Sequence, residues 1–95
     1  AIFAGSDLQA MGVYEAARQL GLRIPEDLSV VGFDDVQTAA FLGPALTTVR
    51  QPLQDMARAA VRMLVEALST DDVIQPHIIM PTSLVVRNST QQLEG

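Results

Sequence analysis

The 95-residue sequence contains no cysteine, which excludes disulfide bonds, thiolate metal sites and a cysteine nucleophile. His77 is the only histidine, so a histidine-rich metal site is excluded as well. Lysine is also absent, and six scattered arginines stand against eleven acidic residues, giving a net charge of −5. This balance argues against a surface that follows nucleic-acid phosphates, because such a surface concentrates cations.

Long apolar runs are missing too. No stretch approaches the ~18–20 apolar residues of a membrane span, and no basic-then-apolar leader opens the chain. Apolar residues make up 48% of the sequence but are interrupted throughout by polar ones. The composition therefore predicts a soluble, cytoplasmic α/β piece of one domain at most, with no metal and no cofactor.

The first part of the chain has the pattern of a β-α-β unit. The expected elements are a strand over Ala1–Ala4, a helix from Leu8 to Leu20 and a strand over Leu28–Phe33. Gly5-Ser6-Asp7 offers an N-cap for the helix, and Gly21 offers a C-cap. Crossovers of this kind are nearly always right-handed and join parallel strands.

Both expected strands are apolar almost throughout, which is typical of parallel sheets covered on both faces. No third strand of that kind stands beside them in the sequence. We therefore expect either a fragment of a larger sheet or a sheet completed by another copy of the chain.

The second half is predicted to contain one long helix among short elements. These are a helical turn within Val36–Leu42, a short strand over Leu46–Val49, a helix from Leu53 to Leu68, and strands over Ile78–Met80 and Ser83–Val86. Pro52 suits the first turn of the long helix, where a missing amide hydrogen costs nothing. Apolar residues follow the helical period along one side of that helix.

Three segments taken together resemble the LacI/GalR family of bacterial transcription regulators. They are SDLQAMGVYEAARQLGLRIPEDLSVVGFDD, then PALTTVRQP, then MPTSLVVRNST. The match is to the C-terminal part of the effector-binding core of that family. It implies an α/β chain with a partial periplasmic-binding-protein-like type I fold: a parallel β-α-β unit plus a long helix and short strands from a second subdomain.

The resemblance also implies a division of the chain. Residues 1–49 would belong to the C-terminal effector-binding subdomain, residues 50–82 to a hinge and to the N-terminal subdomain, and residues 83–95 to a returning strand and tail. The crossing segments would act as hinges, with Val49, Arg50, Pro52, Met80 and Pro81 as the hinge residues. The family's DNA-binding headpiece matches nothing in these residues.

Asp34 is the first candidate for ligand binding. It follows an apolar strand at its carboxyl end, where open α/β sheets bind ligands, and a carboxylate there can accept hydrogen bonds from vicinal hydroxyls. The alternative is a turn aspartate that caps the next segment. Asp35 is expected to point the other way, as a cap or turn ligand.

Ser6 ends the first strand in the same way and can also bond a ligand hydroxyl, although the family often has asparagine there. Asp7 is expected to cap the helix. Gln51 lies at the hinge near the family's cleft wall, and its alternative is an exposed loop glutamine. Arg50 is expected to form a hinge salt bridge, and His77 to be a solvated loop residue.

A subunit interface is the last candidate surface. Met11 and Tyr14 share the apolar face of the first helix, for which core packing is the alternative, while Phe41 and Leu42 are hard to bury in so short a chain. The resemblance implies that the family dimerises around these four positions. We therefore expect a homodimer or higher oligomer.

The sequence thus predicts an effector-sensing part of a transcription regulator, a repressor that binds a sugar or another small polar metabolite. Operator DNA would be bound only through a headpiece outside these residues. The alternative is a solute-binding protein of a sugar transport system with the same fold, although the PALTTVRQP segment favours the regulator. An enzyme is disfavoured, because the sequence has no nucleophile–base constellation, no paired acids and no glycine-rich phosphate loop.

Overall fold

The computed structural model describes residues 1–69 and 77–93. The chain divides into two compact units, which are described separately below. Unit 1 comprises Ala1–Arg50 and Ser83–Gly95, and unit 2 comprises Gln51–Thr82.

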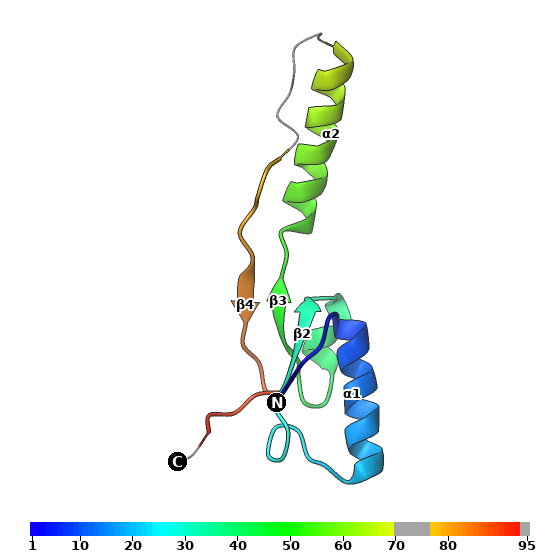
Figure 1. The fold of residues 1–95 in the computed structure, drawn as a ribbon, viewed down its shortest axis with the longest axis vertical. Helices are drawn as coiled ribbons and strands as arrows, with labels where there is room; N and C mark the ends of the chain where they lie inside the picture. The colour runs from blue at the N-terminus through cyan, green and yellow to red at the C-terminus, as the bar shows by residue number, and fades with distance from the viewer. Residues whose placement is uncertain (70–76, 94–95) are drawn as a thin grey trace. The chain divides into compact units, whose positions relative to one another are not determined.

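Unit 1 is built on a four-stranded sheet with the order β1-β2-β3-β4 (Figure 1). Its strands are β1 (Ile2–Phe3), β2 (Val30–Asp34), β3 (Thr47–Arg50) and β4 (Ser83–Val85). β1 and β3 pair in parallel with β2, and β4 pairs antiparallel with β3. The predicted parallel β-α-β unit is therefore confirmed.

The short strand expected over Leu46–Val49 is confirmed as β3, and it is the third parallel strand of the sheet. Its pairing with β2 sets Val31 opposite Thr47 and Phe33 opposite Val49. Its sequence does not look like a buried strand because two of its residues are threonines, yet Thr47 is 2% exposed and Thr48 fully buried. Hydrogen bonds to their hydroxyl groups make this burial possible, since an unpaired hydroxyl would be costly inside the protein.

Helix α1 (Asp7–Leu20) packs against β2 and has the predicted ends. The Ser6 side chain accepts a hydrogen bond from the Gln9 amide at 3.1 Å, so Ser6 is the N-cap. Gly21 is the C-cap, with φ of 71°, a left-handed conformation that glycine adopts without penalty.

The buried residues of α1 have small side chains or, in Asp7, a short polar one. Leu8 and Leu20 are 76% and 74% exposed, whereas Asp7, Ala10 and Ala17 are buried. Small side chains allow the helix to approach the sheet closely, and this approach places the two leucines on the outside. Periodicity alone did not distinguish a face of alanines from a face of leucines.

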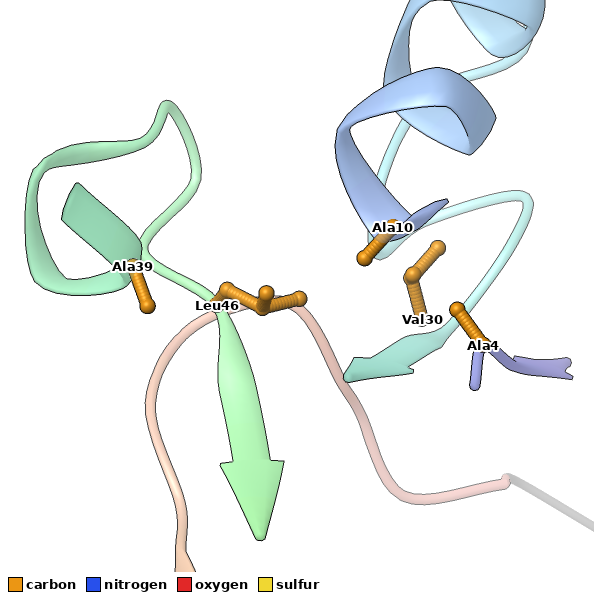
Figure 2. Close-up of a cluster of buried hydrophobic side chains, with 5 residues drawn as sticks. All are labelled: Ala4, Ala10, Val30, Ala39 and Leu46. Carbon is orange, nitrogen blue, oxygen red and sulfur yellow. The ribbon is translucent and has the colours of Figure 1, made fainter. Parts of the chain in front are cut away.

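The core of unit 1 joins side chains from α1, β2, η1 and the residues next to β1 and β3. Its five buried members are Ala4, Ala10, Val30, Ala39 and Leu46 (Figure 2). Ala39 comes from η1 (Gln37–Phe41), a short 3-10 helix that confirms the expected helical turn. Because most members are small, this core stabilises unit 1 only modestly.

Unit 2 contains helix α2 (Leu53–Ser69), which follows Pro52 as predicted. Across its described residues α2 buries none of its side chains, and large apolar residues such as Val61 and Leu64 are each 61% exposed. The predicted strand over Ile78–Met80 is wrong, because residues 77–82 are extended without the ladder partner that a strand requires. Within the described ranges, no helix is both long and apolar enough to cross a bilayer.

Candidate ligand-binding site

The carboxyl ends of β2 and β3 lie at one edge of the sheet, because the two strands run in parallel and Asp34 is in register opposite Arg50. β1 runs in the same direction and leads through Gly5 into α1. In open parallel sheets this edge is where ligands bind. Two of the predicted ligand-binding residues thus lie at the carboxyl ends of neighbouring parallel strands: Ser6 comes shortly after β1, and Asp34 is the last residue of β2.

A strained turn closes β2 at this edge. Asp34 has φ of 117° and Asp35 has φ of 56°, values that residues with a Cβ rarely adopt. Each such residue costs about 1–3 kcal/mol and persists only where surrounding contacts impose it. Strain of this kind gathers at functional sites, so this turn is the strongest local indication of one.

Asp35 is held by two arginines. Its carboxylate oxygens accept hydrogen bonds from Arg50 Nε and from Arg87 Nη2, both at 2.7 Å. Burial would raise the pKa of Asp35, but the hydrogen bonds and charges of Arg87 and Arg50 outweigh it and lower the pKa below its ordinary value. Asp35 therefore carries its charge at neutral pH. Arg50 forms the predicted salt bridge, while its role in a hinge stays a prediction.

Asp7 is the first residue of α1, is fully buried, and contacts the residue that follows the same turn. Its carboxylate accepts a hydrogen bond from the Thr48 hydroxyl at 2.6 Å and another from the Val36 amide at 2.7 Å. The expectation that Asp7 caps α1 is wrong, because Ser6 is the N-cap and both Asp7 oxygens bond outside the helix. Asp7 instead joins the start of α1 to β3 and to the residue after the turn.

Gly32 leaves the space that the Asp7 carboxylate needs. A Cβ atom at this position would collide with the Asp7 side chain and would lie 2.9 Å from Leu46 Cδ2. The strand glycine is thus required by close approach of two neighbouring side chains. Sequence reasoning missed this contact, although a glycine inside an apolar strand was a signal for it.

The edge offers carboxylate and hydroxyl groups rather than a metal centre. Among the residues that the structure describes, no group of three or more metal-ligating side chains comes together. Carboxylate and hydroxyl oxygens arranged along strand ends suit a ligand that donates several hydrogen bonds, as a polyol does.

Comparison with known proteins agrees with this architecture. The family model for the periplasmic binding protein-like domain matches residues 1–90. The chain belongs to this family. The resemblance to LacI/GalR regulators and the predicted fold class are thereby confirmed, since the similar proteins are LacI-type regulators.

A curated relative from Streptomyces limosus, an uncharacterised HTH-type transcriptional regulator, is 53% identical over 88 residues, which is 93% of this chain and 25% of that protein. A solved LacI family regulator from Enterococcus faecalis with bound ribose has a TM-score of 0.92 at 32% identity, covering 98% of this chain and 35% of that one.

The lac repressor dimer bound to operator and an anti-inducer has a TM-score of 0.84 at 33% identity, covering 93% of this chain and 30% of that one. The chain spans about a quarter of the length of the curated relatives it matches.

The remaining predicted residues of this periplasmic-binding-protein-like chain lie in several places. Gln51, Pro52 and Met80 line a hollow of unit 2, and His77 is exposed. Gln51 is the first residue of that unit, so its contribution to a site with Ser6 and Asp34 stays a prediction.

The four predicted interface residues differ in exposure. Phe41 is 83% exposed, whereas Leu42 and Tyr14 pack against the core of unit 1. The Tyr14 hydroxyl also donates a hydrogen bond to the Pro44 carbonyl oxygen at 2.7 Å, and Met11 is half-buried.

Proposed function

We propose that this chain is the effector-sensing part of a LacI/GalR-type DNA-binding transcription regulator, a repressor whose effector is a sugar or a related small polar metabolite. The observation that carries the proposal is the strained Asp34–Asp35 turn at the carboxyl end of β2. Its place is where open α/β sheets bind ligands, and a similar family member has ribose bound.

In the proposed site Asp34 accepts hydrogen bonds from neighbouring hydroxyl groups of the effector. The Ser6 oxygen already accepts the helix-capping bond from Gln9, so Ser6 would act toward the ligand as a donor through its hydroxyl hydrogen. Gln51 would add an amide. Such a set of acceptors and donors favours a neutral, hydroxyl-rich ligand.

The division of the chain supports a hinged response. We propose that residues 1–49 and 83–95 belong to one subdomain and residues 50–82 to the other, with Val49, Arg50, Pro52, Met80 and Pro81 at the crossings. The compact units divide close to these boundaries, at Arg50 and Ser83. Effector binding would shift the population of headpiece geometries that fit the operator, the headpiece lying outside these residues.

An assembly of two copies is part of the proposal. Phe41 is exposed on unit 1, and so are Leu8 and Leu20 of α1. Met11, Tyr14 and Leu42 offer further partly exposed apolar atoms. We propose that Met11, Tyr14, Phe41 and Leu42 contribute to contacts between subunits of a homodimer or higher oligomer.

Because a transcription regulator acts on operator DNA, the proposal places the protein in the cytoplasm. The proposal also assigns it no enzymatic activity. A transport solute-binding protein is disfavoured, because the similar proteins are transcriptional regulators. The gene sequence upstream of Ala1 separates the two. A helix-turn-helix pattern there is expected, and a secretion signal would contradict the regulator.

Sugar binding by the full-length protein that contains these residues tests the site. Isothermal titration with D-ribose and a panel of mono- and disaccharides identifies the tightest sugar. Asp34→Asn should weaken its binding by about 10- to 150-fold, since a hydrogen bond to a charged group contributes roughly 1.5–3 kcal/mol. Asp27→Asn, which changes an exposed aspartate paired with Arg23, is the matched control and should bind normally. Unchanged affinity of Asp34→Asn would remove Asp34 from the site.

A further inference from the structure

The turn after β2 raises the question of what keeps two successive residues in a left-handed backbone. Neither Asp34 nor Asp35 is a glycine, so local preference opposes this conformation. Tertiary contacts must therefore impose it. The contacts come from two sides of the turn.

On one side, the Asp35 side chain is 8% exposed and bonds both Arg50 and Arg87. Arg87 is itself fixed, since its Nη1 donates to the Leu46 carbonyl oxygen at 2.8 Å and its amide donates to the Thr47 hydroxyl at 2.9 Å. Arg87 is 17% exposed at its side chain, so solvent screens this pair far less than the surface pairs of α1.

On the other side, the Asp35 amide donates to the Thr48 hydroxyl oxygen at 3.4 Å, and the next amide, that of Val36, donates to Asp7. The turn is thus fixed by the two ion pairs of the Asp35 side chain and by the hydrogen bonds of the Asp35 and Val36 amides. Asp34 is the last residue of β2 and directly precedes these fixed points, so its backbone direction follows from them.

The arginines also connect the turn to the strands that lead to unit 2. Arg50 is the last residue of β3 and of unit 1, and Arg87 comes just after β4. A single carboxylate therefore binds one arginine from each of the two chain segments that make up unit 1.

We propose that Asp35 is a positioning residue of the effector site, which fixes the Asp34 turn through Arg87 and Arg50 without touching the effector itself. This inference rests on the proposed function. It assigns to the second aspartate of the pair a role that differs from that of the first: Asp34 contacts the ligand, and Asp35 sets the geometry in which it does so. Losing the Asp35 charge leaves Arg87 with the Leu46 carbonyl but without its anionic partner, and frees the turn.

Titration of the full-length protein with the sugar selected above tests the inference. Asp35→Asn should lower sugar affinity by about fivefold or more, within the usual range of coupling between sites. Asp27→Asn removes the carboxylate charge of an exposed pair with Arg23 and should leave affinity within about twofold of the wild type. Circular dichroism verifies that each variant is folded during the titration.

A double-mutant cycle with Arg87→Gln separates positioning from direct contact. If Asp35 acts through Arg87, Asp35→Asn combined with Arg87→Gln should bind the sugar no more weakly than the worse single variant. Additive losses would indicate that Asp35 touches the effector and would overturn the inference. Normal affinity of Asp35→Asn beside weak binding of Asp34→Asn would overturn it too, while leaving the proposed function intact.

If no sugar of the panel binds, that failure counts only against the proposed effector class. A measurement made without sugar then still tests the role of Asp35. Amide hydrogen exchange at Val36 reports the turn directly, because this amide donates to the buried Asp7. Exchange there should be about tenfold faster or more in Asp35→Asn than in the wild type or Asp27→Asn. Equal exchange in all three proteins would show that Asp35 does not fix the turn.

Discussion

Removing the buried carboxylate of Asp7 should destabilise unit 1 more than any change at its surface. Asp7 is fully buried and accepts two hydrogen bonds, from the Thr48 hydroxyl at 2.6 Å and the Val36 amide at 2.7 Å. In Asp7→Ala both donors lose this acceptor, and the Thr48 hydroxyl loses it inside a fully buried residue. The alanine also relieves the cost of burying a charge, which offsets part of the loss.

The magnitude follows from those two bonds. A hydrogen bond to a charged group contributes about 1.5–3 kcal/mol, so two bonds less the relieved desolvation predict a loss of about 2–5 kcal/mol for Asp7→Ala. Asp7→Asn should cost less, about 1–2 kcal/mol, because its amide oxygen can accept from Val36 while its NH2 group donates to Thr48. A domain is stable by only about 5–15 kcal/mol, so the alanine variant loses a large share.

Urea unfolding followed by circular dichroism measures the total change in the full-length protein. Because several domains need not unfold in one step, hydrogen exchange across residues 30–50 gives the local change. Thr48→Val is the matched partner, since it removes one donor while keeping the side-chain shape. A loss below about 1 kcal/mol in Asp7→Ala would refute the reasoning, because the two donors would then have found other partners.

Two further predictions concern packing and assembly. Gly32→Ala should destabilise unit 1 by more than about 2 kcal/mol, because its Cβ meets Asp7 and Leu46, whereas Gly12→Ala, with no atom within 4 Å, should stabilise α1 by about 0.5–1 kcal/mol in urea unfolding. If both alanines have the same effect, the close approach at Gly32 is not real. Sedimentation equilibrium of the full-length protein should give a dimer or larger species at micromolar concentration, and Phe41→Ser should shift it toward monomer. A wild-type monomer would contradict the proposed interface.

The elements that the sequence predicted well are those decided by neighbouring residues. The start of α1 follows from a serine oxygen that bonds an amide three residues away, and its end from a glycine that accepts a left-handed backbone. The parallel arrangement of β1 and β2 follows from the crossover between them. Pro52 and the helical period placed α2 in the same way.

Tertiary structure decided which of these surfaces are buried and what the acidic residues do. Thr47 and Thr48 are buried in the sheet because partners from other elements bond their hydroxyl groups, and on α1 Ala10 and Ala17 are buried while Leu8 is exposed. The same holds at the candidate site. Asp7 meets a residue 41 positions later, and Asp35 meets one 52 positions later. A side chain's charge and reach can be read from the sequence, but the partner that fixes it comes from folding, and at such separations no local pattern specifies that partner.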